Sequence, residues 1–228
     1  MDVSSDTLTE YEICMQSAER RVFHLLHSSE WHHHTEKRSG TVWKMRCSVT
    51  ENNMFRYEGY IRNRTPVEVA IMVHPEGEHR NKWDSQSGGT PLIARIREDT
   101  CIIRHDSKAR LMGLVAAREA VDLCRFATDP EDGTRSVVMV SVTHPSAPLR
   151  EGIVRVHTHP SLLLISPSGN DTKVTSIIQA ELHLMGLPAG IVDSFVPKGI
   201  LEFFDDLREY SAKNLKLNLD QRLTGWVS

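Results

Sequence analysis

The stretch "GIVDSFVPKGILEFFDDLREYSAKNLKL", residues 190–217, decides the fold more than any other. Its apolar residues recur at helical spacing and form one stripe: Ile191, Phe195, Leu201, Phe204, Leu207 and Tyr210. The charged residues between them are predicted to face mostly solvent: Asp205, Asp206, Arg208 and Glu209. Pro197 and Gly199 are expected to kink this helix or divide it. The stretch predicts a long C-terminal helix that buries one face.

A second amphipathic helix is predicted over residues 6–27 from the same periodicity. Between the two helices the pattern changes to short strands, which are "TVWKMRCSV", "NMFRYEGYIRN", "PLIARIRE", "TCIIRHD", "EAVDLCRFATD", "TRSVVMVSVTH", "GIVRVHTHP", "SLLLISP" and "TKVTSIIQAELH". One interruption, "TPVEVAIMVHPEG", fits a short helix with Pro66 in its first turn. This order indicates an α+β fold with a meandering antiparallel sheet, and it contains no glycine-rich phosphate loop.

The bulk properties exclude several classes of protein. The chain has 228 residues, enough for one large domain or two small ones, and a net charge of −3, which does not suggest electrostatic capture of nucleic acid. The N-terminus does not read as a signal peptide, and no run of ~18 apolar residues predicts a spanning helix. The four cysteines are widely spaced without a C-x-x-C pair, which is typical of reduced thiols. We expect a globular, cytoplasmic protein.

"HTHPSLLLISPSGND", residues 157–171, resembles the metal-binding signature of the JAMM metallopeptidases. In that hypothesis His157, His159 and Asp171 hold zinc, and Ser168 helps to bind an oxyanion. However, seven residues separate Pro160 from the Ser-x-x-Asp element here, against six in that signature. A strand followed by a turn explains the pattern better. "WHHHTE", residues 31–36, is likewise interpreted as a short strand or surface run, so we expect no metal and no cofactor.

Eight segments, in this order and spacing, carry a resemblance to a known family. They are "MFRYEGYI", "KWD", "AREAVDL", "EDGT", "SVTHP", "GIVRVHTHP", "TKVTSII" and "GLPAGIVDSFVPKGI". The chain resembles the StAR-related lipid-transfer (START) domains, most closely the small single-domain soluble subgroup. The resemblance covers residues 5–213, and residues 214–228 are expected to be a loose tail in which Trp226 is the one candidate for packing against the domain.

The resemblance implies a helix-grip fold, in which a curved antiparallel sheet wraps around the long C-terminal helix and encloses an apolar cavity. It implies a monomeric, non-enzymatic carrier of one apolar lipid, a sterol or other isoprenoid-like ligand, with transient contact to a membrane surface. An alternative is a binder that sequesters a carotenoid, hormone or bile-acid-like ligand without transfer between membranes. The remote alternative is the zinc hydrolase.

The cavity departs from the sterol-binding pattern. Relatives commonly place an acidic residue and an arginine inside it, and those positions match Ala109 and Cys124 here. The usual "PRDF" is "AREA", which keeps Arg118 but replaces the aromatic residue with Ala120. A family serine on the next strand falls near Val137 or Val138. The resemblance therefore implies a more apolar and wider cavity.

The ligand-binding residues expected from this register are Leu111, Met112, Leu114, Arg118, Ala120, Asp122, Cys124, Ser136, Val138, Arg155, His157, Phe195, Ile200 and Phe204. An inward Asp122 would need a partner, such as Arg118, a ligand hydroxyl or water. In the alternative, Asp122 lies at a solvent-exposed edge of the sheet, and Val121 and Leu123 face a core under the first helix. Arg155 is either a donor to a polar ligand head or one half of a structural ion pair.

Overall fold

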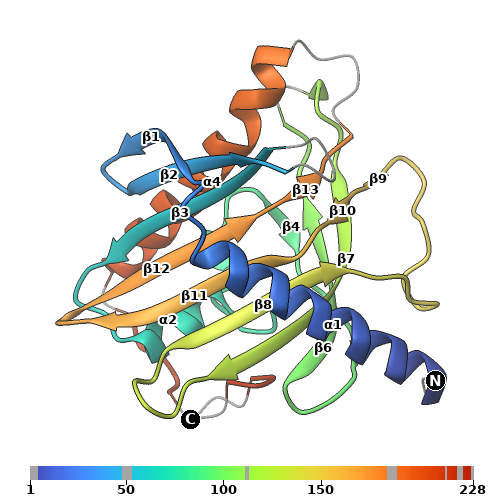
Figure 1. Cartoon of the computed structure of the whole chain (residues 1–228), viewed down its shortest axis with the longest axis horizontal. Coiled ribbons are helices and arrows are strands. Elements are labelled where there is room, and N and C mark those ends of the chain that lie inside the picture. The colour runs from blue at the N-terminus through green and yellow to red at the C-terminus, as the bar shows by residue number, and fades with distance from the viewer. Residues whose placement is uncertain are drawn as a thin grey trace.

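The computed structural model describes residues 5–47, 53–110, 113–183, 189–213, 215–219 and 223–226, with the backbone alone for 189–193. In chain order the elements are α1 (Ser5–Leu26), β1 (His32–Lys37), β2 (Gly40–Arg46), β3 (Asn53–Ile61), α2 (Pro66–Val73), α3 (Arg80–Trp83), β4 (Ser87–Gly89), β5 (Leu92–Arg95), β6 (Thr100–Ser107), β7 (Arg118–Thr128), β8 (Arg135–Ser141), β9 (Val154–Arg155), β10 (His157–Thr158), β11 (Ser161–Ser168), β12 (Asp171–Ile178), β13 (Ala180–Glu181) and α4 (Ala189–Ser211) (Figure 1).

Eleven of these strands form one curved sheet. Its main path runs β1-β2-β3-β12-β11-β8-β7-β6-β4, with β5 paired to β6 and β9 to β7. All described pairs are antiparallel except β7 with β9, which run parallel over two residues. A separate ribbon of β10 and β13 follows the end of β9. The meandering antiparallel sheet predicted from the strand pattern is therefore confirmed.

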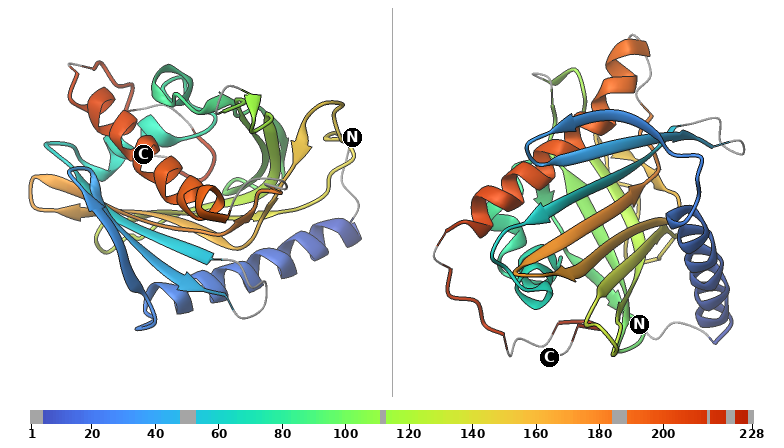
Figure 2. Two further views of the ribbon diagram at one scale, coloured as in Figure 1. Left: turned by 90° about the horizontal axis from the view of Figure 1, so that it is seen from above. Right: turned by 60° about the vertical axis from the view of Figure 1, so that its left-hand side comes forward.

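The two long helices cover opposite faces of the sheet (Figure 2). On the outer face α1 packs over β8, and buried residues such as Met15 and Val22 form a core there with Val121, Leu123 and Val138. On the inner, concave face α4 packs over β3 and β2, where the ring of Phe204 stacks on that of Tyr57 at 3.8 Å. The sheet is thus the middle layer, and the helix-grip arrangement is as predicted.

Helix α4 is one uninterrupted element from Ala189 to Ser211, so of the two expected effects of Pro197 and Gly199, a kink or a division, the division is wrong. Proline inside a helix removes one backbone hydrogen bond but does not end the helix where packing holds the next turn. Gly199 serves a close approach instead: a Cβ there would lie 3.2 Å from Gln86 Oε1. The Gln86 side-chain amide donates to the Gly199 carbonyl at 2.8 Å. No described helix is both long enough and apolar enough to span a bilayer.

The short helix α2 closes one end of the concave face. Thr65 and Glu68 form a capping box, in which the Thr65 hydroxyl accepts from the Glu68 backbone N–H and the Glu68 carboxylate accepts from the Thr65 N–H. Pro66 occupies the first turn, as predicted. The five residues from Val69 to Val73 are all buried, so α2 is a wall of the inner core rather than a surface helix.

Candidate functional site

A cavity of about 380 Å³ lies between the concave face of the sheet and α4. This volume falls within the range of small-molecule pockets in proteins. Its walls come from β6, β7, β8, β11, β12 and α4, and the apolar residues among them include Val137, Met139, Leu163, Ile178, Val196 and Phe203. Many wall residues, such as Leu163 and Ile200, also belong to the inner hydrophobic core. The pocket wall and the core are one surface.

Six of the fourteen expected ligand-binding residues line this cavity. They are Ala120, Asp122 and Cys124 from β7, and Phe195, Ile200 and Phe204 from α4. The three residues on β7 share a face because successive side chains of a strand point to opposite sides. Val121 and Leu123, on the other face of β7, pack under α1. Asp122 is 3% exposed, so it does not lie at a wet sheet edge.

The structure places the other expected residues elsewhere. Leu111 and Met112 lie outside the described residues, and Leu114 is 73% exposed. Val138 is in the core under α1, because on β8 it is Val137 and Met139 that face the cavity; Ser136 shares the parity of Val138. His157 is exposed on β10, with its ring edge-on to that of His159. None of these four described residues lines the cavity.

Arg118 and Arg155 hold parts of the fold together instead of facing the cavity. The Arg118 guanidinium donates to the carbonyls of Leu182, at 2.9 Å, and Ala116. Arg155 donates to the carboxylate of Glu119 at 2.7 and 3.0 Å. Glu119 is fully buried on the outer side of β7, and hydrogen bonds from Arg155 and Arg150 hold its pKa below the ordinary value despite burial.

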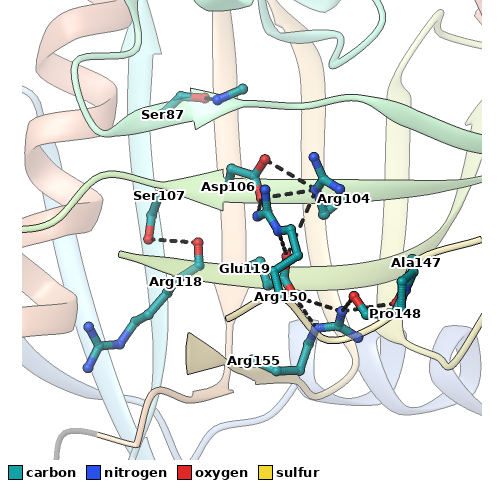
Figure 3. Close-up of polar contacts among 11 residues, drawn as sticks. Ser87, Arg104, Asp106, Ser107, Arg118, Glu119, Ala147, Pro148, Arg150 and Arg155 are labelled. Atoms are coloured by element: carbon teal, nitrogen blue, oxygen red, sulfur yellow. Dashed lines mark hydrogen bonds and ion pairs between the residues drawn. The ribbon is translucent and has the colours of Figure 1, made fainter. Parts of the chain in front are cut away.

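Figure 3 shows that Arg150 and Arg155 approach Glu119 together, while Arg118 points away from this group. Arg150 bonds both Glu119 and Asp106, so one arginine bridges β6 and β7 from the loop before β9. The group fastens the loop over residues 142–153 to the sheet. Of the two interpretations of Arg155, the structure supports the ion pair.

Asp122 supplies a charge inside the cavity, and hydroxyl groups satisfy it. The Ser141 hydroxyl donates to Oδ1 at 2.7 Å, and the Thr158 hydroxyl to Oδ2 at 3.2 Å. Burial raises the pKa of Asp122 to about 6, although both hydrogen bonds favour the carboxylate. Arg118, named above as one possible partner, does not contact it among the hydrogen bonds described.

His105, on β6, completes this polar part of the wall and was missed by the sequence analysis. Its Nε2 lies 3.9 Å from Asp122 Oδ2, too far for a hydrogen bond. Among the described residues that buried nitrogen has no hydrogen-bond partner. Burial, with a smaller effect of Arg80, lowers the pKa of His105 to about 3, so the ring is neutral at pH 7. The cavity, which was expected to be more apolar than that of sterol-binding relatives, therefore carries a local polar site at Asp122 and His105.

The far end of the cavity, beyond Cys124, is aromatic. Phe126 and Trp226 line it, and the ring of His74 stacks on Phe126 at 4.6 Å. The packing of Trp226 agrees with its sequence-based role as the one candidate in the tail. Phe126 continues the alternation of Ala120, Asp122 and Cys124 on β7, which was the available signal for its place in the wall, whereas His74 had no signal in a single sequence.

The zinc hypothesis does not match the geometry. His157 and His159 come before β11, whereas Asp171 starts β12 at the opposite end of that hairpin, bonded to Arg62 and to the backbone of Asn63. The strand between them has eight residues, a span of about 25 Å at ~3.3 Å per residue. These three side chains therefore cannot share one ion, and the described residues contain no group of three or more metal-binding side chains arranged around a common site.

Comparisons with known proteins agree with this architecture. The family model described as START domain matches residues 30–216. The StAR-related lipid transfer protein 5 of Homo sapiens is 34% identical over 160 residues, which cover 69% of this chain and 74% of that protein; the Mus musculus protein is 32% identical over the same length. A solved structure of the human protein superposes with a TM-score of 0.82 at 26% identity, covering 89% of this chain and 97% of that one. The chain belongs to the StAR-related lipid-transfer (START) domain family.

Proposed function

We propose that this protein binds one largely apolar lipid that carries a single hydrogen-bonding group, and that it moves this lipid between membranes. The observation that carries the proposal is a mostly apolar cavity whose wall places the carboxylate of Asp122 beside Nε2 of His105, a buried nitrogen without a hydrogen-bond partner among the described residues. A sterol or a hydroxylated isoprenoid such as a carotenoid has this chemistry. Membership of the START family supports a lipid as the ligand class.

Burial of apolar surface supplies the affinity. Removing roughly 400 Å² of apolar ligand surface from water contributes about 10 kcal/mol at ~25 cal/mol per Å². The loss of translational and rotational freedom on binding offsets a substantial part of this. Shape and apolarity therefore suffice to retain a lipid, and the carrying step requires no bond chemistry.

The polar site supplies selectivity. A ligand hydroxyl can donate to Asp122, whose two oxygens still have free acceptor positions after bonding Ser141 and Thr158. The same hydroxyl can pair with Nε2 of His105, as donor or acceptor depending on the tautomer. A pure hydrocarbon would leave that buried nitrogen unpaired, which costs about 1–3 kcal/mol. We therefore expect lipids with a hydroxyl group to be preferred.

We expect release of the lipid to require that α4 moves away from the segments that carry Gln86 and Arg110. Arg110 bridges the two sides by bonding Gln86 and, on α4, Glu202. Its guanidinium also lies over the Phe195 ring, 5.3 Å from the centroid. These contacts are partly exposed and polar, so they can exchange with water or lipid headgroups at a membrane surface. We accordingly propose a monomer that contacts membranes transiently.

The alternative within this proposal is a binder that sequesters its ligand without transferring it. The proposed compartment is the cytoplasm, because all four cysteines are free and three of them are buried. The test is a native mass spectrum after incubation with a mixed lipid extract, followed by transfer from donor to acceptor vesicles. One lipid per chain with transfer supports the carrier, and one lipid without transfer supports sequestration. Absence of bound lipid refutes both.

The Asp122→Leu variant tests the polar site. It should remain cooperatively folded and lose its preference for a hydroxylated lipid over the matching hydrocarbon by about tenfold or more, since a hydrogen bond to a charged group contributes roughly 1.5–3 kcal/mol. Ala120→Val, on the same face of β7, is the matched control that alters cavity shape and keeps the polar site. An unchanged preference in a folded Asp122→Leu protein would remove Asp122 from the site.

A further inference from the structure

The described C-terminal residues 223–226 lie far from the start of α4 (Figures 1 and 2), and Trp226 among them lines the cavity. Residues 223–226 are anchored by polar contacts to Glu76 and to the turn between β5 and β6. The Thr224 hydroxyl bonds Glu76 and Arg95, and the Gly225 N–H donates to the Glu98 carbonyl at 2.8 Å. The segment is therefore fixed in place on both sides of the cavity end.

Trp226 forms the floor of the cavity. Its side chain lines the cavity, and the residue is 4% exposed. Its ring packs edge-on against Phe126 at 5.0 Å and His74 at 5.4 Å, and its Nε1 donates to the Ala127 carbonyl at 3.1 Å. Because the indole N–H already has an acceptor, the ring offers the cavity only apolar surface.

The histidine in this floor is also closed to a ligand. The Glu76 backbone N–H donates to Nδ1 of His74 at 3.1 Å, so the proton is on Nε2, which donates to the Thr224 carbonyl at 3.2 Å. Burial lowers the pKa of His74 to about 4, which keeps this tautomer neutral at pH 7. Both nitrogens are used by the backbone, so neither ring nitrogen of His74 is free to bond a ligand.

The backbone turn before Trp226 brings the chain unusually close to β7. Gly225 has a φ of +66°, and a Cβ at that position would lie 2.5 Å from Phe126 Cβ. Glycine is the residue that tolerates both the left-handed conformation and this approach. The turn therefore seats Trp226 directly beside Phe126 instead of leaving a gap.

The floor lies at a defined distance from the polar site. Asp122 and Phe126 both line the cavity from β7, four residues apart, which corresponds to about 14 Å at ~3.4 Å per residue. A lipid whose hydroxyl group bonds Asp122 and His105 can extend by about this length before its tip meets Trp226. The family match ends at residue 216, so the segment that provides the floor lies beyond it.

We infer that the C-terminal segment is a plug for the cavity. Trp226 then determines the greatest length of lipid that fits between the polar site, formed by Asp122 and His105, and this end of the cavity. This inference rests on the proposed lipid-binding function and specifies its selectivity. The chemical class it implies is an isoprenoid or straight-chain lipid with a hydroxyl group at one end and an apolar tip of limited length at the other.

A graded series of straight-chain primary alcohols tests the plug in the full-length protein, with binding measured by displacement of an apolar fluorescent probe. For the wild type, affinity should rise about fourfold for each added methylene until the tip reaches Trp226, and then fall. In Trp226→Ala the optimum should move to longer chains, with about the same fourfold gain for each methylene newly accommodated. Trp31→Ala is the matched control, because Trp31 is buried in the core under α1, away from the cavity.

Quenching of tryptophan fluorescence gives a second measurement that does not depend on the folding of Trp226→Ala. An alcohol brominated at its terminal carbon should quench the wild type more strongly than Trp226→Phe, whereas bromine beside the hydroxyl should quench both equally. If the alcohols bind but the length optimum and the quenching are the same in all variants, the plug is refuted. If no alcohol or lipid binds the wild type, it is the proposed function that fails.

Discussion

Replacing Asp122 with asparagine should abolish a loss of stability that the wild type undergoes as the pH rises from 4 to 8, although it also removes a hydrogen-bonded carboxylate. Asp122 is 3% exposed and its pKa is raised from 3.8 to about 6, with burial as the main cause. Ser141 and Thr158 donate to the carboxylate, and the titratable or charged groups that interact with it are His105, Arg155 and the Cys124 thiol. Asparagine has nearly the same shape but does not ionise.

The sign follows from proton linkage. A carboxyl group with a raised pKa in the folded state contributes stability that is fully present below pH 3.8 and is lost as the pH rises through 6. At 1.36 kcal/mol for each pH unit, the whole loss is about 3 kcal/mol. The free energy of unfolding of Asp122→Asn minus that of the wild type should therefore increase by about 2.5 kcal/mol as the pH rises from 4 to 8. A constant offset from the altered hydrogen bonds does not affect this slope.

Urea denaturation at a series of pH values measures the difference directly. The wild type and Asp122→Asn should share one m-value, so that only the midpoint changes with pH. His105→Gln is the control, since it keeps Asp122 and removes its nearest titratable neighbour. Parallel curves for wild type and Asp122→Asn would refute the argument. Loss of the slope in His105→Gln would instead show that the two groups titrate as one unit.

Three further outcomes follow from the other polar groups. Glu119→Gln should lower the free energy of unfolding by about 2 kcal/mol, because charge-assisted hydrogen bonds to two arginines are lost. This loss should become smaller as the pH falls and the wild-type carboxylate is protonated. Urea unfolding at two pH values measures it. Thr65→Ala should cost about 1 kcal/mol through loss of the helix cap, as measured by the thermal midpoint, whereas Thr65→Ser should cost much less. His74 has a pKa lowered to about 4, so its contribution to stability falls as the pH drops from 6.5 through 4. Its protonation removes the acceptor for the Glu76 N–H, and Trp226 emission should shift to the red near pH 4, a change that Trp226→Phe must lack.

The elements of the fold were predictable because each has a strong local pattern. The stripe from Phe195 to Tyr210 marks a helix, and alternating residues in "EAVDLCRFATD" mark a strand that is buried on both faces. The register taken from the family resemblance put Arg118, Ala120, Asp122 and Cys124 on one face of β7, and all of these except Arg118 line the cavity. The register did not give the face of β8. Val137 and Val138 are consecutive residues, so their side chains point to opposite faces, Val137 into the cavity and Val138 under α1.

The parts that escaped prediction depend on contacts between distant segments. His105 was part of a recognised strand, but its place beside Asp122 is set by the pairing of β6 with β7, in which Ile103 is opposite Asp122. The alternation Cys101, Ile103, His105 was the available signal, since two apolar residues share its face. The position of Trp226 at the end of the cavity had no local signal, because residues 223–226 are too few to show a helical or strand pattern of apolar residues.

Because the core and the pocket wall are one surface, the free energy of unfolding of the protein should depend on whether a lipid is bound. Leu163, Ile200 and Phe204 belong both to the inner core and to the cavity wall, so a lipid bound as proposed would add contacts to the core itself. At a free lipid concentration 100 times the dissociation constant, occupancy adds about 2.7 kcal/mol to the free energy of unfolding. Empty molecules would unfold and be degraded faster than loaded ones. The abundance of the carrier would then follow the supply of the lipid without any change in synthesis.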